Sequence, residues 1–422
     1  MIDRIVLKNG LRIVLVPQPK SPTATALVLV EAGSEYESKP TNGISHFLEH
    51  LVFKGTTKRP RAGMIATELD GLGASYNAFT AQEYTGYWAK AQSHKIDHVL
   101  ELVSDLYLHP LIDEHEMDKE RGVIIEELHM YEDTPMRKIG DYFMELLYGD
   151  QPAGWDIGGT VSNIRAITRQ QVIDYRTAHY VPAKTAVVVS GDFSKKRIIS
   201  AVEKSFGLLP RRPIIRKTPT VLRQQKSRVY IKHKESDQSH IMLGVPAFDM
   251  HDRRRYPLEV LSALLGSGMS SRLFHRIREQ MGAAYYVRSG ADLFIDHGFF
   301  AISAGVDHAK IDAVIGAILD ECSRVIRESI SSAELRKTKD HLIGTFMLSL
   351  ETSDELGSFY GFQEIARKKL IDPDGVIAKI EAVTSAHVRS VARDIFLPER
   401  LHMAVVGPYQ DVDHFSSLLR FP

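Results

Sequence analysis

The sequence predicts an α+β fold of two homologous units, each a mostly antiparallel sheet packed with helices. The main observation is an internal repeat, in which residues 167–191 recur as residues 383–407, an offset of 216 residues and about half the chain. In each copy a capped helix leads through a Pro turn into a buried strand. The same order of strands and helices precedes the repeat in both halves, so a duplicated unit explains the pattern.

Two further observations set the boundaries of the units. Residues 1–8 alternate as a strand, Asn9-Gly10 has the sequence of a hairpin turn, and residues 11–16 form a second strand. Between the halves, residues 209–219 are basic and rich in Pro, which is typical of a linker. We therefore expect an N-terminal domain over residues 1–209 and a C-terminal domain over residues 220–422.

Composition excludes several classes of function. The chain has 53 basic and 53 acidic residues, so nothing indicates binding to nucleic acid or to an acidic membrane surface. A single cysteine, Cys322, excludes an internal disulfide and fits a reducing compartment. No apolar run is long enough to cross a bilayer, and no signal-peptide pattern opens the chain. We expect a cytoplasmic protein without a membrane span.

The segment Gly-Ile-Ser-His-Phe-Leu-Glu-His-Leu at residues 43–51 is the most informative part of the chain. In a helix, His46, Glu49 and His50 lie on one side and apolar residues cover the other. Two imidazoles one turn apart can share a Zn²⁺, and the carboxylate beside them can accept a proton from metal-activated water. The order His-x-x-Glu-His inverts a known metalloprotease motif. The alternative is a solvent-facing polar side of an amphipathic helix.

A second predicted helix, residues 117–131, offers a third ligand. Glu120 and Glu127 lie within its apolar stripe, whereas Glu126 lies nearly opposite. Because a carboxylate on a buried face is costly unless it is paired or bound to a metal, we expect Glu127 to be the ligand and Glu126 a solvated charge. Glu120 lies about 10 Å along the axis from Glu127, too far to share the ion. It either orients a ligating His or forms a buried salt bridge with Arg or Lys.

His46, His50 and Glu127 make a set of two His and one Glu that leaves a coordination position for water, the composition of a catalytic zinc site with one Zn²⁺ per chain. The motif His46-Phe-Leu-Glu49-His50, followed after 76 residues by Glu127, closely resembles the pitrilysin family of inverzincin metallopeptidases. That family includes insulin-degrading enzymes and mitochondrial processing peptidases, and the chain length resembles its short-subunit branch. At the same 216-residue offset, residues 262–266 carry no metal motif.

The resemblance extends over nearly the whole chain and implies how substrate is held. Asn77, Ala78 and Thr80 lie in a segment similar to the family's substrate-binding edge strand, which implies peptides bound as an added β-strand. Arg278 and Tyr285 lie in segments similar to its C-terminal substrate clamp. Taken without the resemblance, these two residues would be a surface Arg and a core Tyr. Similar segments also include residues 53–56, directly after the zinc helix, and residues 268–274.

The resemblance implies a zinc-dependent endopeptidase that hydrolyses peptides or unfolded segments, with Glu49 as general base. Arg278 would grip a carboxylate or carbonyl of the substrate, and Tyr285 would donate a hydrogen bond to the developing oxyanion. It further implies an enclosed chamber formed by a homodimer, or by a heterodimer with a zinc-less paralogue. One alternative is a non-catalytic assembly subunit of the same fold. Another is a zinc enzyme of the S-ribosylhomocysteine lyase type, which takes a Cys ligand that this chain lacks near the site.

Overall fold

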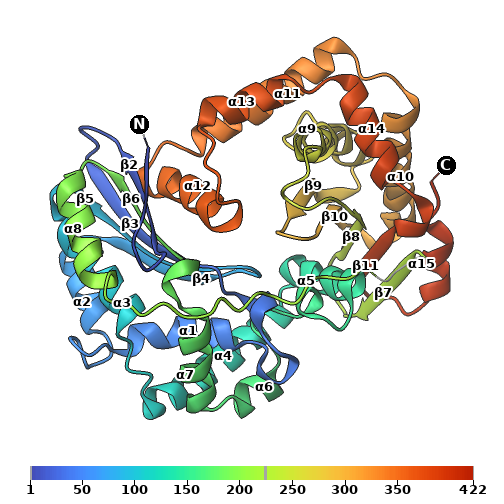
Figure 1. The fold of residues 1–422 in the computed structure, drawn as a ribbon. Helices are drawn as coiled ribbons and strands as arrows, with labels where there is room; N and C mark the ends of the chain where they lie inside the picture. Colours follow the sequence, from blue (N-terminus) through green and yellow to red (C-terminus); the bar gives the residue numbers. More distant parts are fainter. Residues whose placement is uncertain (1, 223–225, 422) are drawn as a thin grey trace. The chain divides into compact units, whose positions relative to one another are not determined.

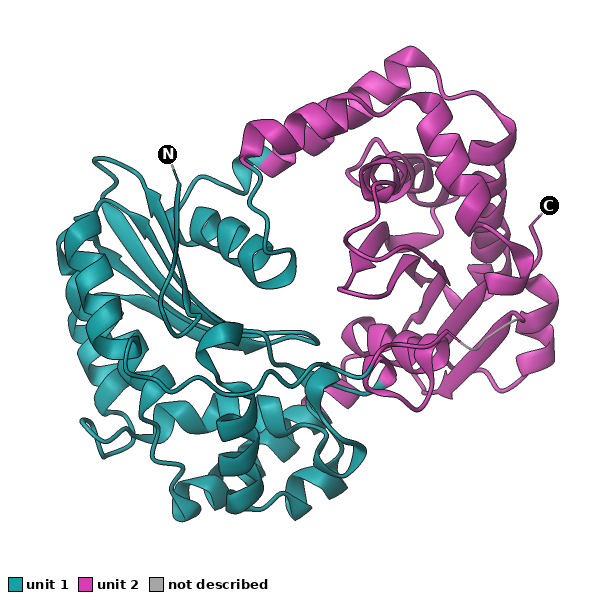
Figure 2. Cartoon of the chain, viewed as in Figure 1, with its two compact units in different colours: residues 1–129, 155–218, 347–371 teal, residues 130–154, 219–346, 372–422 magenta. Residues whose placement is uncertain are grey.

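The computed structural model describes residues 2–222 and 226–421. The chain forms two compact units, coloured separately in Figure 2. The first contains Met1–His129, Trp155–Thr218 and Met347–Ile371, and the second contains Met130–Gly154, Pro219–Phe346 and Asp372–Pro422. Each unit has its own sheet and its own helices, so the predicted α+β class with two homologous units is confirmed.

The first unit is built on a six-stranded sheet in the order β1-β2-β6-β3-β5-β4. Only the β2–β6 pair is parallel among its described pairs, and the other neighbours are antiparallel. The predicted hairpin at Asn9-Gly10 is present, with Gly10 at a φ of 95°. The strands are β1 Asp3–Val6, β2 Arg12–Pro17, β3 Thr23–Val30, β4 Ser75–Thr80, β5 Thr85–Gln92 and β6 Thr185–Gly191.

Helices cover both faces of this sheet, as Figure 1 shows for α3 and α8 on one face and α12 on the other. Successive residues of β3 therefore enter different cores: Val28 packs toward α3, and Leu27 packs toward α12. The helices of this unit are α1 Ile44–Leu51, α2 Met64–Gly71, α3 Ile96–Leu108, α4 Glu114–Glu132, α6 Val161–Ala166, α7 Arg169–His179, α8 Lys195–Phe206 and α12 Ser353–Ala366, with α4 running on into the second unit.

The second unit is built on a five-stranded sheet in the order β7-β11-β8-β10-β9. Its β7–β11 pair is parallel and its other pairs are antiparallel. The strands are β7 Arg228–His233, β8 Ser239–Pro246, β9 Ala284–Leu293, β10 Gly298–Val306 and β11 His402–Gly407. The helices are α5 Pro135–Tyr148, α9 Arg255–Gly266, the π-helix Phe274–Gln280, α10 Ile311–Arg327, α11 Ser332–Leu348, α13 Pro373–Glu381, α14 Ser385–Ile395 and α15 Val412–Leu418. Among the described helices none is both long and apolar enough to span a membrane.

The internal repeat corresponds to equivalent elements of the two units. Helix α14 and strand β11 stand 216 residues after α7 and β6. Both helices begin with a capping box at the same offset, with Thr168 and Gln171 in the first copy and Thr384 and His387 in the second. The repeat therefore extends to the hydrogen bonds that start the helix.

The compact units differ from the predicted domains, which were bounded at residues 209 and 220. Each unit includes one helix from the other half of the sequence. Helix α5 packs on the second sheet, where Phe143 contacts Phe299 of β10. Helix α12 packs on the first sheet, where Tyr360 and Ile365 share a core with Leu27 and Val188. The two helices occupy similar places in the two halves of the sequence, so the halves exchange equivalent helices.

Candidate metal centre

Three polar side chains lie together on one side of helix α1, because the apolar residues on its other side pack into the core. Phe47, Leu48 and Leu51 are fully buried in the first unit. His46, Glu49 and His50 occupy the other side of the helix and are only partly buried. This division follows the helical period of the sequence.

A buried carboxylate outside the helix fixes its N-terminus. Glu37 accepts hydrogen bonds from the backbone N–H groups of Gly43, at 2.7 Å, and Ser45, at 2.8 Å, and from the Asn42 amide at 3.0 Å. Gly43 has a φ of 98°, and a Cβ there would lie 2.6 Å from the carbonyl oxygen of Gly158. Sequence reasoning missed Glu37, and its one signal was an acid shortly before a glycine that starts a helix.

The structure brings His46, His50 and Glu127 together. The Nε2 atoms of His46 and His50 lie 3.7 and 3.4 Å from the same Glu127 oxygen, Oε2. One ligand atom from each of the three residues lies within 4.8 Å of the others. Glu126, by contrast, has an 82% exposed side chain against 22% for Glu127. The choice between the two acids made from the helical stripe therefore agrees with their positions.

The donor set fits a zinc ion. Tetrahedral Zn²⁺ with ligands at about 2.0–2.1 Å keeps those ligand atoms roughly 3.4 Å apart. The two nitrogen-to-oxygen distances to Glu127 are close to that value. Nitrogen and carboxylate ligands in a two-to-one ratio are also the composition of catalytic zinc sites. His46, His50 and Glu127 could thus hold the metal with little rearrangement.

Glu49 lies beside this set in an environment that makes it more basic than a free carboxylate. Burial raises its pKa most, and the charge of Glu127 adds to that effect. Polar groups of Thr80 and the His50 imidazole act in the opposite direction without cancelling it. A carboxyl with a raised pKa is better able to accept a proton near neutral pH.

Glu120 makes the contacts that both of its predicted roles would require, one to a His and one to a Lys. Its Oε2 lies 3.1 Å from the Nδ1 of His50, and its Oε1 lies 2.6 Å from the Nζ of Lys54. A carboxylate at Nδ1 favours the tautomer that leaves Nε2 free for a metal. Burial lowers the pKa of His50, but hydrogen bonds to Glu127 and Glu120 outweigh it, and the net shift is upward.

The predicted substrate strand, β4, is the outermost strand of the first sheet. Asn77, Ala78 and Thr80 pair with β5 through Trp88, Tyr87 and Thr85. The backbone N–H of Ala78 donates to the Asn77 side-chain oxygen at 2.9 Å. Thr80 ends the strand beside Glu49. Thr80 thus places the end of the edge strand close to Glu49.

The predicted clamp residues lie in the second unit. Arg278 is in the last turn of the π-helix, and Tyr285 is near the start of β9. The Tyr285 side chain is 73% exposed, so the alternative of a core Tyr is wrong. The Arg278 guanidinium lies 4.9 Å from the Phe274 ring and 5.9 Å from the Tyr285 ring. π-Helical turns are rare and frequently occur at functional sites.

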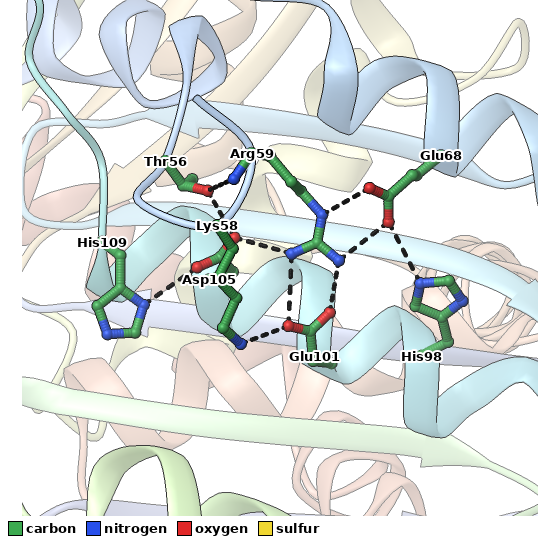
Figure 3. A network of polar contacts seen from close by, with 8 residues as sticks. All are labelled: Thr56, Lys58, Arg59, Glu68, His98, Glu101, Asp105 and His109. Carbon is green, nitrogen blue, oxygen red and sulfur yellow. Dashed lines mark hydrogen bonds and ion pairs between the residues drawn. The ribbon is translucent and has the colours of Figure 1, made fainter. Parts of the chain in front are cut away.

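The loop after the zinc helix is held by a network of ion pairs around Arg59, shown in Figure 3. The Arg59 guanidinium contacts Glu68, Glu101 and Asp105 at 2.7–2.8 Å. The Thr56 hydroxyl donates to Asp105 at 2.6 Å and accepts from the Arg59 N–H. Thr56 and Arg59 therefore tie this loop to helices α2 and α3.

The buried Glu37 carboxyl predicts a pH-dependent stability. Burial raises its pKa from the ordinary 4.5 to about 7, although the N–H groups of Ser45 and Gly43 oppose the shift. Between these values the folded chain binds more protons than the unfolded chain, so stability is lost as pH rises through about 7. We expect Glu37→Gln to remove up to about 3 kcal/mol of this dependence.

Denaturant unfolding of the chelator-treated protein from pH 4.5 to 8 measures the effect for the wild type and Glu37→Gln. We expect the wild type to lose stability relative to the variant across this range. A constant difference between the two proteins would show that Glu37 does not titrate in this window.

Comparisons with known proteins found two family profiles and several relatives that match the chain. The profile described as insulinase (Peptidase family M16) matches residues 12–161, and the one described as Peptidase M16 inactive domain matches residues 166–342. An uncharacterized zinc protease of Streptomyces coelicolor is 34% identical, over 97% of this chain and 90% of its own. The uncharacterized zinc protease YmxG of Bacillus subtilis is 33% identical, over 97% of this chain and 98% of its own.

Solved structures share the fold. A protease from Helicobacter pylori superposes with a TM-score of 0.89 at 23% identity and covers 97% of this chain and 99% of its own. A chain of the Candida albicans complex III₂ superposes with a TM-score of 0.85 at 16% identity, covering 99% of this chain and 100% of its own. The inactive-domain profile matches residues 166–342, which begin in the first unit and continue into the second, where α9 is a buried core helix.

Proposed function

Because this chain belongs to peptidase family M16, we propose that it is a zinc-dependent endopeptidase acting on peptides or unfolded protein segments. The observation that carries the proposal is the convergence of His46, His50 and Glu127 beside Glu49. The names of the bacterial relatives, which call them zinc proteases, support the same chemistry. The assignments of individual residues below are part of this proposal.

His46, His50 and Glu127 would hold the metal, one ion per chain. A bound zinc ion polarises a carbonyl and makes water more acidic. Glu49 accepts the proton of the attacking water while the water oxygen adds to the scissile carbonyl carbon. When the C–N bond breaks, Glu49 passes that proton to the leaving amine. Glu120 keeps the His50 ring in the orientation that His50 needs to bind the metal.

The substrate would bind as an added strand on β4. This strand is outermost in its sheet, and the Ala78 N–H donates to the neighbouring Asn77 side-chain oxygen. An incoming peptide carbonyl can replace the Asn77 oxygen at no loss in the number of hydrogen bonds. Backbone pairing of this kind gives affinity with little preference for side chains. Thr80 brings the end of the strand to Glu49.

Arg278 and Tyr285 would act as the clamp, from the second unit of a partner subunit in an enclosed homodimer. Both side chains are exposed, which supports this role, because an exposed aromatic ring beside a guanidinium can bind an incoming chain. A heterodimer with a zinc-less paralogue is the other assembly to consider. Both forms are expectations that follow from the family resemblance of the sequence.

Complementation between two inactive chains tests the assembly. Arg278→Ala and Glu49→Gln chains should each be weakly active or inactive when alone. In a homodimer with clamps acting in trans, mixing them in equal amounts restores about a quarter of wild-type activity, because half the dimers are mixed and each has one intact site. Mixing two batches of Glu49→Gln is the control. A mixture no more active than its components would contradict the clamp in trans.

Digestion of a defined peptide mixture by the purified protein tests the activity itself. We expect internal cleavages that disappear with a chelator and return with added Zn²⁺. A non-catalytic assembly subunit of the same fold would leave the mixture intact under both conditions. Mass spectrometry of the products also identifies the cleaved bonds.

A further inference from the structure

Lys54 lies at a position where it can influence a metal ligand without touching the metal. It ends the short 3₁₀ turn Val52–Lys54, which continues directly from α1. Its Nζ is 2.6 Å from Glu120 Oε1, while Glu120 Oε2 is 3.1 Å from His50 Nδ1. The two oxygens of one carboxylate thus join the end of the zinc helix to the ring of a predicted ligand.

Burial makes this arrangement different from a surface ion pair. The Glu120 side chain is 8% exposed and that of Lys54 is 29% exposed. A carboxylate at such a depth is costly unless its oxygens have partners. Among the described contacts of Glu120, Lys54 supplies its one fixed positive charge. Without Lys54, one oxygen of Glu120 would lose its partner, and the side chain would gain by turning toward solvent and away from His50.

The backbone that carries Lys54 is itself constrained. The next residue, Gly55, has a φ of 139°, and a Cβ there would lie 2.9 Å from the carbonyl oxygen of Pro60. Thr56 is held by its hydrogen bond to the buried Asp105. The position of Lys54 therefore follows from the turn and not from its own flexible side chain.

We propose that Lys54 is a positioning residue of the metal centre. It holds the Glu120 carboxylate in place, and that carboxylate in turn orients the His50 ring. The inference rests on the proposed zinc-dependent function, and it adds a residue that the metal itself does not contact. It also assigns a role to the conspicuous sequence Phe-Lys-Gly-Thr at residues 53–56. The chain after the zinc helix supplies a charge that reaches the ligand through one intermediate carboxylate.

Zinc affinity of the purified full chain, measured by competition with a chromogenic chelator, tests the proposal. We expect Lys54→Met to weaken zinc binding by about 10-fold or more, since partners behind a ligand typically contribute 10–100-fold. Lys54→Arg keeps the positive charge, so this variant should bind zinc more tightly than Lys54→Met. Lys54→Gln keeps polarity without charge and should also bind zinc more weakly than the wild type. It replaces Lys54→Met in the test if that variant does not fold.

Lys58→Met is the matched control. Lys58 makes an ion pair of the same 2.6 Å length with Glu101, but both side chains are more exposed, and Glu101 also binds Arg59 (Figure 3). Its loss should change zinc affinity by less than about twofold. Thermal unfolding of each metal-free variant shows separately whether the substitution affects the fold.

A double-mutant cycle distinguishes positioning from a general structural effect. Because Lys54 acts through Glu120, adding Lys54→Met to Glu120→Gln should weaken zinc binding no further. Additive losses, or a Lys54→Met chain with wild-type affinity, would overturn the inference. Peptide hydrolysis by the wild type is scored apart from these measurements. A chain that binds zinc in a Lys54-dependent way but cleaves nothing would refute the proposed activity alone.

Discussion

A Glu49→Gln chain should bind zinc as the wild type does and hydrolyse peptides about 10²–10⁴-fold more slowly. Glutamine has nearly the shape of glutamate but cannot accept the proton of the attacking water. Because Glu49 is not among the three residues that converge on one another, the metal should be retained. Rates on one fluorogenic peptide, together with zinc content per chain, measure both expectations.

The reference variant for this measurement is Glu126→Gln, which makes the same chemical change at an exposed position on α4. It should keep activity within about twofold of the wild type, as surface substitutions usually do. A Glu49→Gln chain that remains fully active would rule out Glu49 as the general base. Loss of zinc from that chain would instead place Glu49 among the ligands.

Glu127→Gln should weaken zinc binding by more than about 100-fold. Residues that only hydrogen-bond to a metal ligand already contribute about 10–100-fold to metal affinity, so the loss of a ligand itself should cost more. Its Oε2 is the atom that both histidines approach, and an amide is a poorer zinc ligand than a carboxylate. Activity should fall in parallel and recover in part at high zinc concentration. Chelator competition measures the zinc affinity, and rate measurements over a range of zinc concentrations measure the loss and recovery of activity.

Glu126→Gln again provides the comparison, this time one residue away on the same helix. It should bind zinc as tightly as the wild type, since its side chain is 82% exposed. The opposite pattern, with Glu126→Gln losing zinc and Glu127→Gln retaining it, would show that the wrong carboxylate was chosen. Equal retention by both variants would remove α4 from the metal centre.

Periodicity explains why much of the site could be predicted. His46, Glu49 and His50 share one side of α1 because the apolar residues between them occupy the other. The same reasoning separated Glu127 from Glu126 on α4, since the Glu127 side chain is partly buried and that of Glu126 is exposed. The repeat likewise predicted equivalent helices and strands, because capping residues and the Pro turn recur at one offset.

Contacts that do not follow a local period could not be predicted. Glu37 caps α1 from outside the helix, so no pattern of apolar residues marks it. The Lys54–Glu120 pair joins two elements far apart in sequence, and the sequence offered only an unspecified Arg or Lys as partner. The exchange of α5 and α12 was also missed, because an amphipathic pattern shows that a helix has a buried face but not which sheet covers it.

The central claim, that His46, His50 and Glu127 bind one catalytic zinc ion, is tested most directly by titrating the metal-free chain with Zn²⁺ while following peptide cleavage. The claim predicts that activity rises in step with tight zinc uptake and levels off at about one ion per chain. A His50→Ala chain should show neither the uptake nor the rise. Cleavage that is undiminished in the metal-free chain, or tight uptake that His50→Ala leaves unchanged, would contradict it.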